Sequence, residues 1–124
     1  MEVTGLTISG RGLNRLINEL EQEFESDAED IYYHKSGNTA ILISESFYFR
    51  VKSNLLSILV IDTADKEKYK IKIIAGGGAQ GFLGITLGSE SHRSEKILKV
   101  LEKICAKNEW SIKSVKILQK SLGF

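Results

Sequence analysis

The 124-residue chain contains no proline, only one cysteine, and almost equal numbers of basic and acidic side chains. A single cysteine excludes an internal disulfide framework and any metal site built from several cysteines. Seventeen basic and sixteen acidic side chains leave a formal charge of +1, which excludes a function that depends on bulk charge alone. No apolar run approaches the roughly 18 residues needed to cross a membrane.

A mass of 13.8 kDa and a hydrophobic share of 42% are sufficient for one core, so we expect residues 1–124 to form a single domain. Met1 to Gly5 lacks the basic and apolar regions of a signal peptide. We therefore expect a soluble, cytoplasmic protein that neither enters nor crosses a membrane.

The first third of the chain predicts a strand followed by an amphipathic helix. Residues 3–9 alternate in polarity and indicate a strand, and Ser9 is the expected helix N-cap. A helix then reaches about Asp27, with glutamates on its polar faces. Its apolar positions recur at helical spacing: Leu13, Leu16, Ile17, Leu20 and Phe24.

The middle of the chain predicts four strands joined by short turns, at residues 31–34, 39–52, 55–62 and 66–74. Connections this short join antiparallel neighbours. The last of these strands carries lysines on one parity, Lys66, Lys68, Lys70 and Lys72, and apolar residues on the other.

The final third predicts a possible strand at 82–87, a second helix from about Ser89, and a strand over 110–118 that also fits a helix. The second helix has one apolar stripe: Ile97, Leu98, Leu101, Ile104 and Cys105. The order β-α-β-β-β-β-(β)-α-(β) indicates an α+β domain, with an antiparallel sheet of about five or six strands and two helices packed on one face.

A glycine-rich segment begins at Ala75 and is the first candidate binding site. Gly76, Gly78 and Gly81 satisfy the G-x-G-x-x-G spacing, but the β-prone residues that follow do not open the helix that a dinucleotide site requires. We expect a turn between strands whose backbone amides could bind a ligand. The candidate ligand-binding residues are Gly76, Gly77, Gly78, Gln80 and Gly81.

A basic stripe on the second helix is the other candidate site. Arg93, Lys96, Lys99, Lys103 and Lys107 fall within about a third of the helix circumference, opposite the apolar stripe. Such a stripe fits nucleic acid or another polyanion, and the lysines of residues 66–72 would extend it. A solvated helix face, or a charge match with the acidic first helix, explains the same pattern.

Residues suited to catalysis or to metal or cofactor binding do not form a recognisable set. His34 and His92 lack ligands at metal-site spacing, and Cys105 lies in an apolar stripe. Glu45 shares the parity of apolar neighbours, so we expect either a bulge that turns it to solvent or a polar group at a pocket wall. We therefore expect no enzyme, no metal and no cofactor.

Residues 73–80, followed by Phe82, Ile85-Thr86, Gly88, Glu90 and a helix, are the part of the chain that carries a resemblance. This stretch resembles the end of a family of small uncharacterised bacterial proteins. In that family a strand, a Gly-Gly-x-Gln turn, a second strand and a closing helix follow one another. The resemblance implies an α+β fold and no particular activity.

Two helices can cover only one face of such a sheet, so we expect the other face to bind a partner. We expect it to carry Leu42, Tyr48 and alternate residues of 55–61. The sequence thus predicts a non-catalytic binding or self-association module. Its partner is another protein or a second copy, in a homodimer formed by that face or by the segment around Trp110. In the alternative, residues 110–124 fold back over the sheet.

Overall fold

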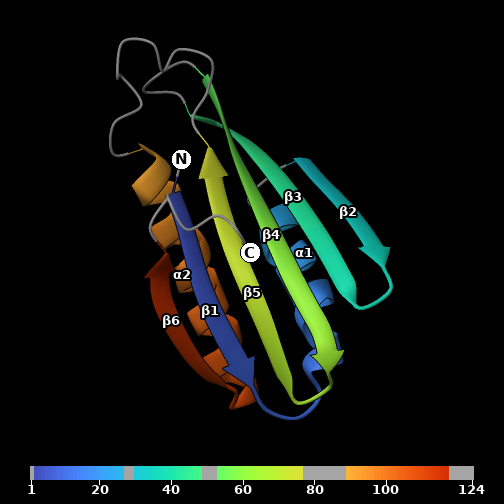
Figure 1. Cartoon of the computed structure of the whole chain (residues 1–124). Coiled ribbons are helices and arrows are strands. Elements are labelled where there is room, and N and C mark those ends of the chain that lie inside the picture. The colour runs from blue at the N-terminus through green and yellow to red at the C-terminus, as the bar shows by residue number, and fades with distance from the viewer. Residues whose placement is uncertain (1, 27–29, 49–52, 77–88, 118–124) are drawn as a thin grey trace.

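A computed structural model describes residues 2–26, 30–48, 53–76 and 89–117. They form one six-stranded antiparallel sheet in the order β2-β3-β4-β5-β1-β6, with both helices on the same face (Figure 1). This arrangement confirms the predicted α+β class and the packing of two helices on one side. Within these residues, neither helix is both long and apolar enough to cross a membrane.

The strands and helices follow the predicted order with shifted ends. The elements are β1 (Glu2–Ser9), a 3-10 helix (Leu13–Arg15), α1 (Leu16–Ser26), β2 (Asp30–Ser36), β3 (Thr39–Tyr48), β4 (Ser53–Asp65), β5 (Lys68–Gly76), α2 (Ser89–Asn108) and β6 (Ser111–Ile117). Residues 111–117, which the sequence fits to either a strand or a helix, form the strand β6, which pairs with β1 at the edge of the sheet. The rest of the segment that could fold back over the sheet, residues 118–124, lies outside the described residues.

Hairpins build one half of the sheet, and long-range pairing builds the other. Gly37, at φ 58°, lies in the tight turn that joins β2 to β3, where glycine tolerates a left-handed backbone. The turn between β4 and β5 lies at Lys66-Glu67, later than the predicted turn at 62–65, after an irregularity in β4. β1 then pairs with both β5 and β6, which places the N-terminal strand inside the sheet.

One hydrophobic core fills the space between the sheet and the helices. Both predicted helix stripes pack into it, and Ile17 and Leu98 are only partly buried. The sheet contributes residues of one parity from each inner strand. The largest fully buried side chains of this core are Ile8, Leu13, Leu16, Leu20, Phe24, Leu42, Leu59, Ile61, Ile71, Ile73, Ile97 and Leu101. A buried serine pair, Ser44 and Ser57, shares a hydrogen bond of 2.7 Å on the same face.

Trp110 fastens the start of β6 to the loop after β1. Its indole Nε1 donates a hydrogen bond to the carbonyl oxygen of Arg11 at 2.6 Å, and the Arg15 guanidinium lies 5.6 Å from the ring centroid. A Cβ atom at Gly10 would collide with the Trp110 ring, so glycine permits this close approach. Trp110 is 6% exposed and belongs to the core.

The predicted orientation of β3 is wrong. Leu42 is fully buried beneath the helices, whereas Ile41, Ile43 and Glu45 lie on the opposite face and are half-buried. The register between β3 and β4 continues through Glu45, so the expected bulge is absent there. We expected Leu42 on the uncovered face, but the helices cover the parity that contains it. The structure does not describe the side chain of Tyr48.

The start of the first helix also differs from the prediction. Ser9 ends β1, and Gly12, at φ 74°, stands at the N-terminus of the 3-10 helix that precedes α1. The possible strand at 82–87 lies outside the described residues.

Truncation of Leu101 to alanine tests the packing of α2 on the sheet. Leu101 is fully buried, so Leu101→Ala should lower the free energy of unfolding by about 2–5 kcal/mol. Lys99→Ala on the exposed side of the helix should change it by less than about 0.5 kcal/mol. Urea denaturation measures both, and equal losses would contradict the packing.

Candidate functional site

The face of the sheet opposite the helices carries a cluster of lysines on β5 and on the edge strand β6. Lys68, Lys70 and Lys72 project from β5 on this face, which Figure 1 shows toward the viewer. Lys70 and Lys113 of β6 both lie directly across from Thr7 of β1. Alternate residues of one strand are about 7 Å apart, and strands on either side of a third are about 10 Å apart. The four ammonium groups therefore share one surface.

A shallow hollow lies among these lysines, and we call it the cationic hollow. Its floor is β1, where Gly5 has no side chain and Thr7 and Ser9 offer hydroxyl groups. Lys68, Lys70 and Lys113 are exposed and Lys72 is half-buried. The residues lining the cationic hollow are Gly5, Leu6, Thr7, Ser9, Thr39, Val60, Asp62, Lys68, Lys70, Ile71, Lys72, Ser111 and Lys113.

Asp62 is the single carboxylate in this lining. It lies on β4 directly across from Lys70 and accepts a hydrogen bond from the Ala64 N–H at 3.0 Å. One negative group among four positive ones leaves an excess of positive charge in the hollow. Opposite charges would therefore be attracted to this part of the face.

Apolar side chains continue the same face beside the cationic hollow. Ile43, Ile58 and Ile74 lie across from one another on β3, β4 and β5, and Ile41 pairs with Val60 in the next row toward the lysines. All five are half-buried, and Leu56 further along β4 is 38% exposed. The face is thus divided into a basic part and an apolar part that meet at Val60.

The basic stripe of α2 lies on the other side of the molecule. Its exposed lysines, Lys96, Lys99, Lys103 and Lys107, stand opposite the buried stripe that contacts the sheet. The side chain of Arg93 is outside the described residues. Because the β5 lysines project from the opposite face, they do not extend the helix stripe as the sequence had suggested.

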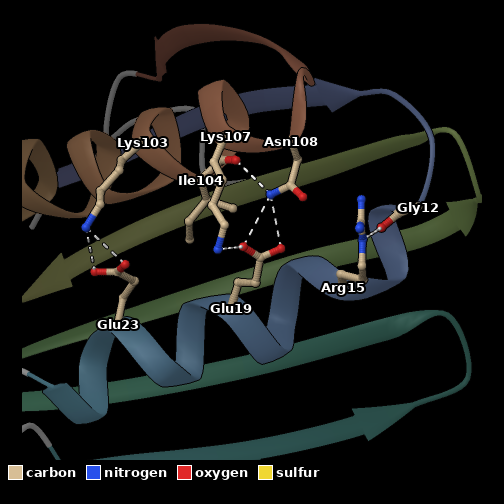
Figure 2. A network of polar contacts seen from close by, with 8 residues as sticks. All are labelled: Gly12, Arg15, Glu19, Glu23, Lys103, Ile104, Lys107 and Asn108. Atoms are coloured by element: carbon tan, nitrogen blue, oxygen red, sulfur yellow. Dashed lines mark hydrogen bonds and ion pairs between the residues drawn. The ribbon is translucent and has the colours of Figure 1, made fainter.

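Two lysines of the helix stripe, Lys103 and Lys107, contact the acidic first helix (Figure 2). Lys103 lies 3.2 Å from Glu23, and Lys107 lies 3.2 Å from Glu19. Asn108 Nδ2 also donates to both carboxylate oxygens of Glu19, at 3.0 and 3.3 Å. The alternative explanation, a charge match between the two helices within one chain, is therefore confirmed for these two lysines.

The glycine-rich candidate site is described only at its first residue. Gly76 ends β5 and pairs with Leu56 of β4. Gly77, Gly78, Gln80 and Gly81 lie outside the described residues, as does the expected positive φ among them. Ligand binding by this turn stays a prediction.

Reactive groups in the described part of the chain are either buried or dispersed. Burial raises the pKa of the Cys105 thiol to about 11, and the nearby Glu102 carboxylate adds to the shift. The thiolate is therefore a minor species at neutral pH. No cluster of three metal-ligating side chains occurs among the described residues. The cationic hollow offers ammonium and hydroxyl groups, which bind anions.

Sequence reasoning missed the members of the hollow that come from β1 and β6. Thr7, Ser9 and Lys113 join the β5 lysines only because β1 pairs with strands more than 50 residues away in the chain. The sequence feature that did point to this surface is the alternation of Lys68, Lys70 and Lys72 with apolar residues. It showed a basic face but not the strands beside it.

Comparisons with known proteins do not add a function. No family model matches the chain, and no curated protein matches it.

Removal of Glu19 tests whether the helix lysines are held by α1. The side chain of Glu19 is 15% exposed and accepts from Asn108 and Lys107, so Glu19→Ala should lower the free energy of unfolding by about 1–2 kcal/mol. Glu25→Ala, at an exposed position on the same helix, should change it by less than about 0.5 kcal/mol. Thermal or urea unfolding measures the free energy of unfolding of both variants. Similar losses in Glu19→Ala and Glu25→Ala would contradict the pairing of Glu19 with Lys107 and Asn108.

Proposed function

We propose that this domain is a non-catalytic binding module whose open sheet face takes an anionic ligand with an apolar part. The observation that carries the proposal is the grouping of Lys68, Lys70, Lys72 and Lys113 around one hollow with a single carboxylate in its lining. These four lysines, on β5 and on the edge strand β6, have no part in the core, and they face away from the helices.

The chemistry of the cationic hollow favours an anion with several oxygens. Ammonium groups donate hydrogen bonds to carboxylate, sulfate or phosphate oxygens, and the hydroxyls of Thr7, Ser9 and Ser111 add donors between them. The spacing of about 7–10 Å between lysines suits a ligand with a broad or extended charged part.

The apolar rows beside the hollow account for the second part of the ligand. Ile41, Ile58 and Val60 border the lysines without a break in the sheet. A ligand that covered these half-buried side chains would remove apolar surface from water. That burial would contribute a favourable binding free energy of about 25 cal/mol for each Å² covered. A purely ionic ligand would leave that contribution unused.

Binding of a polyanion by the basic face of α2 is the second candidate function. Lys96 and Lys99 are exposed and line a groove beside Lys103 and Glu23. The pairing of Lys103 and Lys107 with glutamates lowers the positive charge that this face offers. The open sheet face is therefore the better-supported site.

We also propose a cytoplasmic location, supported by the single buried thiol of Cys105, which suits a reducing compartment. Neither a cofactor nor catalysis is part of the proposal, because the hollow is lined by groups that bind charge rather than by a base paired with a nucleophile.

Fluorescence titration with 8-anilino-1-naphthalenesulfonate, an apolar anion, tests the proposed function. The double variant Lys70→Gln/Lys113→Gln should raise the dissociation constant about tenfold, which corresponds to about 1.4 kcal/mol. Binding to the unaltered chain should weaken as ionic strength rises, because the contacts are exposed ion pairs.

The variant Lys96→Gln/Lys99→Gln is the matched control, since it removes the same charge from the opposite face. It should leave the dissociation constant unchanged. Equal weakening by both variants would show a nonspecific charge effect and would contradict the site. The same pair of variants, titrated with a labelled oligothymidylate, would place polyanion binding on α2 if only the control lost affinity.

A further inference from the structure

We propose that β2 is a self-association edge, which pairs antiparallel with β2 of a second copy to make one continuous sheet. Among the described residues, β2 pairs with β3 alone, so its outer backbone groups face solvent. Six of its seven residues are exposed, all except Ile31, which is half-buried.

The two edges of the sheet differ in how they are protected from such pairing. Lysines, prolines and bulges are the usual features that keep an edge strand from pairing with another chain. β6 contains Lys113 and Lys116 within its seven residues. β2 has an unbroken register with β3 and only Lys35, near its end. Its first half contains Ile31, Tyr32 and Tyr33, which are strand-forming residues.

The sequence of β2 is complementary to itself in one antiparallel register. A two-fold axis perpendicular to the sheet at Tyr32 places Tyr32 opposite its own copy. Ile31 then lies opposite Tyr33, and Asp30 lies opposite His34. Aromatic, apolar and carboxylate–imidazole pairs of this kind are the cross-strand contacts that stabilise a sheet.

Exposure of the aromatic side chains supports this register. Tyr32 is 59% exposed and Tyr33 is 38% exposed, and both are among the large hydrophobic side chains that the fold leaves open. Tyr32 lies on the open face, across from Ile43, while Tyr33 lies on the face of the helices, across from Leu42. Pairing of the two edges would cover aromatic surface on both faces at once.

The second copy is the occupant that the geometry selects. A two-fold axis perpendicular to the sheet keeps both helix layers on one side and both open faces on the other. Two cationic hollows would then face the same way. This inference does not depend on ligand binding, because it rests on the edge strand and not on the lysines.

Disulfide cross-linking of Tyr32→Cys tests the register directly. Residues opposite each other in an antiparallel pair have Cα atoms about 4.5–5.5 Å apart, which a disulfide can span. Mild oxidation should therefore convert Tyr32→Cys to a covalent dimer. Ser36→Cys is the matched control, because its two copies would lie about 27 Å apart in this register. Cys105 is 1% exposed and should not react in the unaltered chain.

Sedimentation at micromolar concentration provides the second measurement. The unaltered chain should have twice the 13.8 kDa mass of one chain, and Tyr32→Glu should give the monomer with an unchanged circular dichroism spectrum. Leu56→Glu, on the open face, should leave the dimer intact. A monomeric unaltered chain, cross-linking of Ser36→Cys as fast as Tyr32→Cys, or loss of the dimer only in Leu56→Glu would each overturn the proposal.

Discussion

The two-residue period of β-strands, combined with helices on one side only, determines most of this structure. Every strand must present one parity to α1 and α2 and the other to the opposite face. Leu42, Leu59 and Ile73 lie in one row beneath the helices, and Ile43, Ile58 and Ile74 lie in the neighbouring row on the open face. The same strand register therefore places one set of side chains in the core and the other set at the candidate site. A shift of one residue in any strand would move the core side chains of that strand to the open face and its open-face side chains to the core.

Much of the fold could be predicted from local patterns, whereas the site depends on pairing between distant segments. Both helices have apolar stripes at helical spacing, and the lysines of β5 alternate with Tyr69, Ile71 and Ile73, so these elements were found with the correct buried side. In β3 both parities are largely apolar, and hydrophobicity alone chose the wrong one. The pairing of β1 with β5 and β6 has no local signal, so Lys113 could not be joined to Lys70 in advance.

Charge has different consequences on the two sides of the molecule. Between the helices, Glu19 and Glu23 engage Lys107 and Lys103, so opposite charges meet within the chain and orient α1 against α2. On the open face, the lysines of β5 and β6 surround a hollow in which Asp62 is the only lining carboxylate. A nearly neutral chain can thus carry a locally basic surface, because the hollow is lined by four lysines and a single carboxylate, while acidic side chains lie elsewhere, four of them on α1.

Chemical-shift mapping of the backbone amides during titration with 8-anilino-1-naphthalenesulfonate tests most directly whether the open face is the binding surface. We expect the largest changes in amide chemical shift in β1 near Thr7, in β5 from Lys68 to Ile74, and in β4 near Val60. The amides on the exposed side of α2 should keep their chemical shifts. Perturbations confined to α2 around Lys96 and Lys99, with β1 and β5 unaffected, would contradict binding at the open face.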